Sequence, residues 1–220
     1  MVFVVKVNQG NGSQTEPLEA ALYPAIIQRV VDLGLQAQEY QGVAKRPARK
    51  VLLVFSIPSE TLEINGENLP RHVSKSFVVS LHEKARFRTI VKLFSPQALE
   101  PGGEFNMLSL LGKQVMVQVD KVEGKDGRHY NQVANIVPLP KGGSVEIPAD
   151  NHDKLMFLDL DDPNKEVVDA LPLWVLKEIS NAVNFATMKG GPMVTEALKA
   201  KMAPKQGQKQ TKMVSEESPI

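Results

Sequence analysis

The chain has 220 residues, of which 42% are hydrophobic, and a formal net charge of +1, so it holds enough apolar material for one domain with appendages. It contains no cysteine, which excludes disulfides, thiol nucleophiles and cysteine-based metal sites and fits a reducing compartment. No apolar run approaches the ~20 residues of a membrane span, and the start MVFVVKVNQG has no signal-cleavage pattern, so we expect a cytoplasmic protein without membrane contact.

The first half of the chain reads as strands separated by turns. Residues 1–20 contain the stretch NQGNGSQTEP, with Gly, Asn and Ser, and we expect a flexible N-terminus. Residues 21–35 fit a strand or a helix, and Pro24 with the β-branched run IIQRVV favours the strand. Residues 51–58, VLLVFSIP, have the length of a strand, and alternation assigns four side chains to the core, namely Val51, Leu53, Phe55 and Ile57. A polar loop with an Asn65-Gly66 turn signal follows.

The middle of the chain adds a strand, a helix and a hairpin. Residues 74–81, SKSFVVSL, alternate as a half-buried strand with Phe77, Val79 and Leu81 inward. Residues 82–94 change to helical spacing over about three turns, and Pro96 ends the helix. Residues 113–122 and 128–140 read as two strands joined by the Gly-rich turn GKDG.

This order of elements predicts a mainly β fold. Three strands, a helix and two strands match a five-stranded OB-type Greek-key barrel with one helix between strands 3 and 4, which would span residues 21–140. A β-sandwich with one helix would show similar runs, so the pattern leaves closure of the barrel open.

The C-terminal third is expected to add a helix and a tail. Residues 141–188 read as an acidic linker followed by a helix packed on the barrel, with an inward set of Trp174, Leu176, Ile179, Val183 and Phe185. Residues 189–220 are rich in Lys, Gln and Pro and poor in apolar side chains, which predicts a disordered tail with an acidic tip at Glu216 and Glu217.

Positive charge is concentrated in one part of the chain. Residues 42–92 carry a net charge of +6, whereas residues 93–160 carry −3. The basic block begins with four cations in QGVAKRPARK and continues through Arg71, His72, Lys75, Lys84, Arg86, Arg88 and Lys92. A basic run is usually a solvated face, but one of this extent makes a polyanionic partner competitive.

The sequence contains little that indicates catalysis. It has no GxxxxGK[ST], GxGxxG, HExxH or GxSxG motif, and its four histidines lack metal-ligand spacing. Three carboxylates, Asp159, Asp161 and Asp162, suit Mg²⁺ coordination in a nuclease-like site, although an N-cap and solvated linker before the Trp174 helix is the favoured interpretation. We therefore expect no catalytic residue, metal or cofactor, and keep a Mg²⁺-dependent nuclease as the enzyme alternative.

Single-stranded nucleic acid needs cations along a groove and aromatic faces for stacking. In an OB barrel this groove crosses strands 2 and 3 between two flanking loops. The predicted nucleic-acid-binding residues on that surface are Tyr40, Lys45, Arg46, Arg49, Lys50, Arg71, Lys75, Lys125, Arg128, His129 and Tyr130. Tyr40 and Tyr130 are the stacking candidates, and a place at the rim of the core explains each of them equally well.

Several stretches also resemble a known family. The segments are YPAIIQRVVDLG, YQG before a basic Pro-containing loop, KVLLVFSIP, SKSFVVSLHEKA, LLGK, YNQVANIVPLPKG, FLDLDD and LPLWVLKEI. In this order they resemble bacteriophage single-stranded-DNA-binding proteins built on an OB-fold, over roughly residues 21–185. The resemblance implies non-catalytic binding that protects single strands during phage DNA replication or recombination, in an infected bacterial cell.

The resemblance also bears on partners. In replication proteins of this kind an acidic, flexible C-terminus recruits partner enzymes, and SEESPI is similar but has only two carboxylates and ends in Ile220. The lysines that precede it would alternatively add non-specific affinity for DNA. A third reading is a protein that modulates a nuclease by placing its basic face on an acidic partner.

Overall fold

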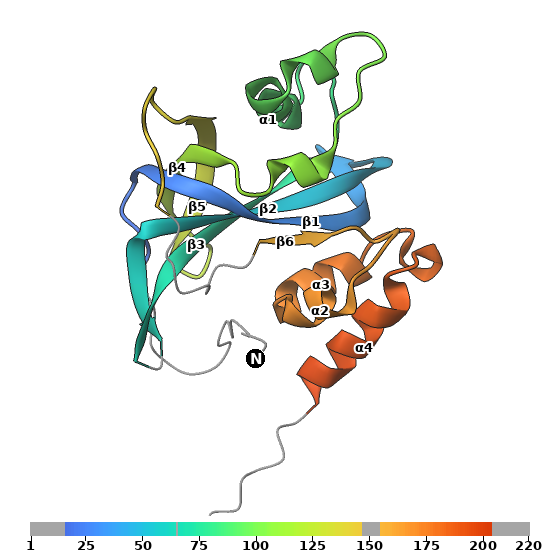
Figure 1. Cartoon of the computed structure of the whole chain (residues 1–220). Coiled ribbons are helices and arrows are strands. Elements are labelled where there is room, and N and C mark those ends of the chain that lie inside the picture. Colours follow the sequence, from blue (N-terminus) through green and yellow to red (C-terminus); the bar gives the residue numbers. More distant parts are fainter. Residues whose placement is uncertain (1–15, 65, 147–154, 204–220) are drawn as a thin grey trace, which may run out of the picture.

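The computed structural model describes residues 16–64, 66–146 and 155–203, and its elements are arranged as in Figure 1. The strands are β1 (Ala21–Tyr40), β2 (Val43–Ile64), β3 (Glu67–Val78), β4 (Gln114–Glu123), β5 (His129–Pro138) and β6 (Met156–Leu158). The helices are α1 (Arg86–Phe94), α2 (Lys165–Ala170), α3 (Leu173–Ser180) and α4 (Gly191–Met202), with 3-10 turns η1 (Pro96–Leu99), η2 (Met107–Leu110) and η3 (Phe185–Thr187). Most of the N-terminus that we expected to be flexible, and the end of the tail with its acidic tip, lie outside the described residues.

The sheet follows the order β3-β2-β1-β4-β5 with every neighbouring pair antiparallel. The short strand β6 joins β1 in parallel at Arg29–Val31. The predicted mainly β fold and the helix between the third and fourth strands are therefore confirmed. In the described sheet β3 and β5 are the two ends of the path and are not paired, so the sheet is open and a closed barrel is not confirmed.

The strand β1 resolves the ambiguity at residues 21–35 in favour of the strand, and it supplies side chains to both faces of the sheet. Ala25 and Ile27 are buried on one face, and a register shift after Ile27 brings Val30 onto the same face. Such a bulge changes the phase of alternation by one residue. Farther along, Val31 and Leu33 are buried on the opposite face. β1 is therefore a shared wall between two cores.

The hairpin of β1 and β2 is much longer than predicted. β2 has 22 residues, where alternation predicted eight, and pairs with β1 as far as Tyr40 opposite Val43. Both residues of the connecting turn, Gln41 and Gly42, have positive φ, at 52° and 76°. This conformation suits the right-handed twist of a tight hairpin. The basic stretch after Gly42 is consequently strand, and our prediction of a loop there is wrong.

The first core lies between the curled sheet and α1, which sits above the sheet in Figure 1. The four predicted core residues of β2 and Phe77 are all buried in it. Phe87 of α1 is also buried, with ring centroids 6.4 Å from Phe77 and 6.0 Å from Phe105. Leu81 was expected inside but is exposed, because β3 ends at Val78.

The helix α1 begins four residues later than predicted. Turn hydrogen bonds occupy the preceding backbone donors: His82 N donates to Ser80 Oγ at 3.3 Å, and Ala85 N donates to the His82 carbonyl at 2.8 Å. The nine-residue helix starts at Arg86 with no side-chain cap and no acidic residue in its first turn. Its first three residues, Arg86, Phe87 and Arg88, therefore carry two positive charges and no negative one.

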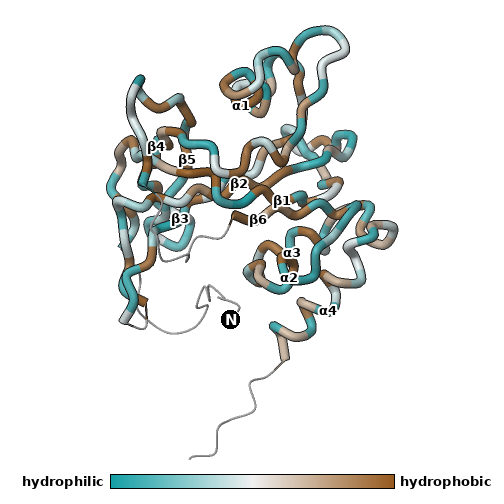
Figure 2. Tube along the Cα trace, viewed as in Figure 1, coloured by the Kyte–Doolittle hydropathy of each residue, from teal (hydrophilic) through white to brown (hydrophobic). Residues whose placement is uncertain are grey.

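The second core lies on the other face of the sheet, against β6, α2, α3 and α4. Leu52 of β2 and Val31 and Leu33 of β1 pack there with Leu158, Leu160 and the apolar faces of the helices. Figure 2 shows hydrophobic residues along the central strands and on the helices below them. Leu176 and Ile179 are buried as predicted, whereas Trp174 and Val183, which we expected inside, are exposed.

Residues 191–202 form α4, so the prediction that they belong to a disordered tail is wrong. The segment has few apolar side chains, but Val194 and Ala197 are buried in the second core. Val194 N also donates to the Gly190 carbonyl at 3.0 Å, and Gly190 N donates to the Leu160 carbonyl at 3.0 Å. Tertiary contacts therefore stabilise a helix that composition alone did not predict. In the part of the chain that the structure describes, no helix is both long and apolar enough to cross a membrane.

Candidate nucleic-acid interface

The eleven predicted binding residues lie at three separate places on the sheet. The first group, from Tyr40 to Lys50, lies at the end of the β1–β2 hairpin. Arg71 and Lys75 lie on β3, where Lys75 is opposite Leu53, eight positions along β2 from Lys45. The third group lies at the β4–β5 turn, beyond the other end of β1, where Ala21 is opposite Val119. The residues thus follow the sheet from end to end instead of facing one another across one trough.

Arg49 is engaged by carboxylates. Its Nε donates to both carboxylate oxygens of Asp32 at 3.2 Å, and its Nη2 donates to the same carboxylate and, at 3.1 Å, to Asp161 Oδ2. Asp159 Oδ1 lies 3.6 Å from the same nitrogen. The hydrogen bond with Asp32 is the main cause that raises the pKa of Arg49, ahead of the Asp161 contributions. Arg49 therefore joins β2 to the chain beyond β6, and its charge is already compensated.

Lys75 lies where β3 and β5 face each other. Its Nζ donates to the Val133 carbonyl and, at 3.2 Å, to the Ala134 carbonyl, both on β5. Burial is the main cause that lowers the pKa of Lys75; Arg86 lowers it further, and Asp120 raises it. Because of this side chain, the two ends of the open sheet are bridged without backbone pairing.

The remaining predicted residues are exposed or locally engaged. Arg71 donates from Nη2 to the Glu16 carbonyl, which fixes the chain before β1. At the β4–β5 turn, Arg128 Nε lies 3.6 Å from Asp126 Oδ2, and Lys125 and His129 are exposed. The tyrosines Tyr40 and Tyr130 are 64% and 53% exposed, respectively, so both rings are open to solvent as stacking would require.

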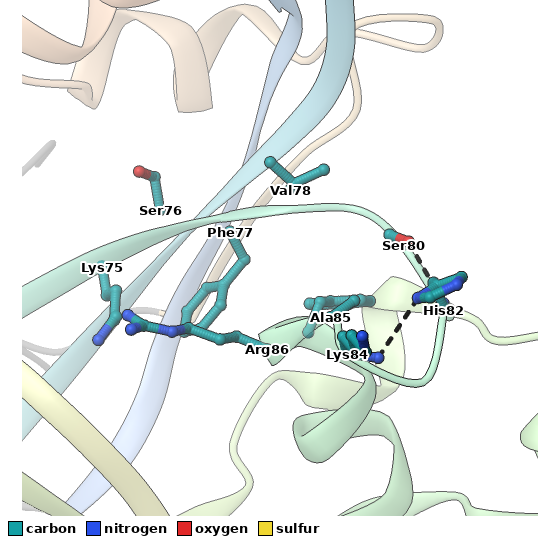
Figure 3. Close-up of a pocket in the computed structure, with 10 residues that line it drawn as sticks. Lys75, Ser76, Phe77, Val78, Ser80, His82, Lys84, Ala85 and Arg86 are labelled. Atoms are coloured by element: carbon teal, nitrogen blue, oxygen red, sulfur yellow. Dashed lines mark hydrogen bonds between the residues drawn. The ribbon is translucent and has the colours of Figure 1, made fainter. Parts of the chain in front are cut away.

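A cationic cleft lies between β3 and the start of α1. It has a volume of about 560 Å³ and includes Lys75, Phe77, His82, Lys84 and Arg86 in its lining. Figure 3 shows the side chains of Lys75 and Arg86 extending toward each other beneath β3, while Ser76 and Val78 project from the other side of the strand. Lys84 and Arg86 are exposed, and neither makes an ion pair with any described residue. Both were noted in the basic run but were not among the predicted site residues.

The cleft continues into the basic part of β2. Val78, which lines the cleft, is opposite Lys50, and Val79 N donates to the Arg49 carbonyl at 2.8 Å. From there β2 leads to Arg46 and Lys45 near the hairpin turn. Lys50 and Val78 project from one face of the sheet, whereas Lys75 and Phe77 project from the other. The line that joins these cations therefore crosses from one face to the other over the edge strand β3.

We call this line the cationic track, and its members are Lys45, Arg46, Lys50, Lys75, Lys84 and Arg86. It extends about 26 Å along β2, from the position opposite Lys75 to Lys45, at ~3.3 Å per residue. Within the described residues none of its six members forms an ion pair. Acidic side chains near it are Glu39, on the hairpin strand opposite Ala44, Glu83, beside Lys84, and Asp120, whose charge raises the pKa of Lys75.

The predicted groove across the second and third strands is partly covered. The C-terminal helices pack on Leu52 and Val54 of β2, so that part of the face is a core. The neighbouring face of β3 is open, with Ser74, Ser76 and Val78 exposed. A ligand on this sheet would therefore lie along the β3 edge, where the cationic track passes.

The carboxylates considered for a nuclease have other contacts. Asp159 and Asp161 lie against Arg49, and Asp159 Oδ1 accepts a hydrogen bond from Asp161 N at 2.9 Å. Among residues 16–64, 66–146 and 155–203, no group of three His, Cys, Asp or Glu side chains is placed to hold a metal ion.

The chain matches no protein-family model, and a search of curated proteins finds no significant match. Functional assignment therefore depends on the geometry and charge of the described residues.

Proposed function

We propose that the chain is a non-catalytic binder of single-stranded DNA and that it holds the sugar-phosphate backbone along the cationic track. The observation that carries the proposal is the set of six cations that form no ion pair among the described residues, which continues from the β3–α1 cleft to the β1–β2 hairpin. Phosphates of an unpaired strand supply the missing negative charge, and their counterions are released on binding. Such contacts do not read bases, so binding is independent of sequence.

The topology supports a barrel of the OB type. The path β3-β2-β1-β4-β5 is the neighbour order of that barrel opened between its third and fifth strands. Lys75 bridges the two open ends through the Val133 and Ala134 carbonyls, and α1 packs into the same core. The proposed role, protection of strands during phage DNA replication or recombination, follows from the family resemblance. Partner recruitment by the C-terminal tail belongs to the same proposal, and its acidic tip lies outside the described residues.

The proposal is tested by removing two track cations at exposed positions. We expect Lys84→Ala with Arg86→Ala to weaken binding of a labelled oligothymidylate about 25-fold at 0.1 M salt, because each lost phosphate contact removes a factor of about five there. The matched control is Lys125→Ala with Arg128→Ala, which removes the same charge from the exposed β4–β5 turn. We expect this control to bind as the unmodified chain does, measured by fluorescence anisotropy.

Other outcomes identify what is wrong. Equal weakening by both double variants would reject the cationic track as the site. Absence of binding to single-stranded DNA by the unmodified chain would reject the function and favour a protein partner. Duplex or RNA binding at equal strength would reject the preference for unpaired DNA. Cleavage of the oligonucleotide in Mg²⁺, abolished by Asp159→Asn, would reject the non-catalytic role.

A further inference from the structure

The cationic cleft between β3 and α1 presents mainly hydrogen-bond donors. The polar side chains among its described lining residues are Lys75, Ser76, Ser80, His82, Lys84 and Arg86, and none of them carries a carboxylate or an amide. Ser80 Oγ accepts from His82 N at 3.3 Å, and His82 Nδ1 accepts from Lys84 N at 3.4 Å, so both acceptors are engaged by backbone donors. The cleft therefore suits a ligand that only accepts hydrogen bonds, as a deprotonated phosphate does.

The turn that carries three of these side chains is held in place by hydrogen bonds of its own. Ala85 N donates to the His82 carbonyl at 2.8 Å, and Arg88 Nη1 donates to the Leu81 carbonyl at 2.7 Å. Figure 3 shows His82 joined to Lys84 within this turn. Because His82 Nδ1 accepts there, the proton of the neutral ring is on Nε2, which is left to donate elsewhere. Donors fixed in this way lose little freedom when they bind a ligand.

Two cations of the cleft are close enough to repel each other. Lys75 and Arg86 extend toward each other in Figure 3. Burial is the main cause that lowers the pKa of Lys75, and the charge of Arg86 comes next, ahead of the opposite effect of Asp120. The two carbonyl partners of Lys75 Nζ are neutral and leave one of its three N–H groups available. An anion placed between Lys75 and Arg86 would relieve this repulsion.

The cationic track ends at the cleft. The track reaches it by crossing β3, and beyond Lys75 lies β5, to whose backbone carbonyls Lys75 Nζ is hydrogen-bonded. The buried rings of Phe77 and Phe87 also line the cleft. A strand that follows the track from β2 is therefore expected to end here, because the cleft gives it no continuation.

The density of charge also distinguishes the cleft from the rest of the track. Lys75, Lys84 and Arg86, half of the members of the track, line a cleft of about 560 Å³, a volume typical of small-molecule sites. The other three members are spread over residues 45–50 of β2, about 17 Å at ~3.3 Å per residue. A phosphodiester carries one negative charge, whereas a phosphate monoester carries about −1.5 to −2 at pH 7 and offers three acceptor oxygens. The monoester matches the three clustered cations better.

We propose that the cationic cleft binds a terminal phosphate monoester, the group that the ends of DNA strands and free nucleotides share. Lys84 and Arg86 pair with its oxygens, and Lys75 faces them from β3. The strand then continues from its bound end over β3 and along β2. This inference rests on the proposed function, because the rest of the strand lies on the same cationic track.

The experiment compares internally labelled oligothymidylates with a 5′-phosphate, a 3′-phosphate or two hydroxyl ends. We expect a phosphorylated strand to bind about fivefold more tightly than the hydroxyl strand at 0.1 M salt, the factor that one phosphate contact contributes there. A hydroxyl strand longer by one nucleotide controls for added charge and should not show this gain. Lys84→Ala with Arg86→Ala should abolish the preference. The matched control, Lys45→Ala with Arg46→Ala at the other end of the track, should weaken all strands alike and keep the preference.

Thymidine 5′-monophosphate distinguishes the two sources of the monoester. Competition that lowers the affinity of the phosphorylated strand to that of the hydroxyl strand would show that free nucleotides also enter the cleft. A preference for the phosphorylated strand without such competition would identify the strand end as the ligand. A second readout is the ³¹P resonance of the monoester, which should shift on binding to the unmodified chain but not to the variant with Lys84→Ala and Arg86→Ala.

Two outcomes would overturn the inference. One is equal affinity for phosphorylated and hydroxyl strands while both remain sensitive to salt, which would leave the proposed function intact. The other is a preference that persists after Lys84→Ala with Arg86→Ala, which would place the monoester outside the cleft. Absence of binding to every strand would instead reject the proposed function, so the two failures are distinguishable.

Discussion

The dependence of DNA affinity on salt should report the number of cations in the track. Six members predict a slope of log affinity against log salt of about −4.2, since each neutralised phosphate of a single strand contributes ~0.7. Between about 50 and 200 mM salt the affinity should then fall about 300-fold. With Lys84→Ala and Arg86→Ala the slope should become about −2.8 and the fall only about 50-fold.

The assay is a set of anisotropy titrations at several salt concentrations with one unlabelled competitor strand. The Lys125→Ala and Arg128→Ala variant is the control and should keep the full slope, because its cations lie at the β4–β5 turn outside the track. If the control reduced the steepness of the slope by the same amount, any surface cation would contribute equally to DNA binding. A slope near zero in the unmodified chain would refute electrostatic binding altogether.

Three further outcomes follow from contacts in the two cores and the cleft. Arg49→Ala should lower the free energy of unfolding by about 1–2 kcal/mol, because a nearly buried carboxylate loses its partner, yet weaken DNA binding less than Lys45→Ala does. Gly34→Ala should cost about 1–3 kcal/mol in urea unfolding, since φ is +73° and the new Cβ meets packed side chains, whereas Gly142→Ala at φ +81° meets nothing and should cost less. Because burial lowers the pKa of Lys75, its charge is lost first as pH rises toward the ordinary lysine range near 10.4, so affinity should begin to fall earlier than with Lys75→Arg; identical pH profiles would contradict this.

The alternation of apolar and polar residues predicted the strands wherever one face of the sheet is buried. It did not predict strand where both faces are exposed. Phe55 and Ile57 belong to a clear buried stripe, and their part of β2 was predicted correctly. Residues 43–48 lie in a two-stranded arm that is largely exposed on both faces, so no stripe marks them as strand. The turn that extends the hairpin is Gln41-Gly42, whose first residue is a weak signal for positive φ. Strand length there is set by pairing with β1, which a single segment does not reveal.

The predicted site residues show a similar limit, because the sequence does not tell which cations form ion pairs in the fold. The four cations at 45–50 look equivalent along the chain, but Arg49 pairs with Asp32 and, across more than a hundred residues, with Asp161. Only the fold separates a compensated cation from an uncompensated one. The signal for Lys84 and Arg86 was present in the basic run, since Glu83 is the only acidic residue from 68 to 92. It was missed because the predicted groove lay on another part of the sheet.

The helical layer beneath the sheet limits how the chain can be shortened. Leu52 of β2 and Val31 and Leu33 of β1 are covered by β6 and the helices up to α4. A fragment that stops after β5 would present this apolar face to water, and exposed patches of that kind promote aggregation. The strands that carry the cations are therefore expected to remain soluble only when the chain extends through Ala197, even though no helix of that layer contributes a cation to the track.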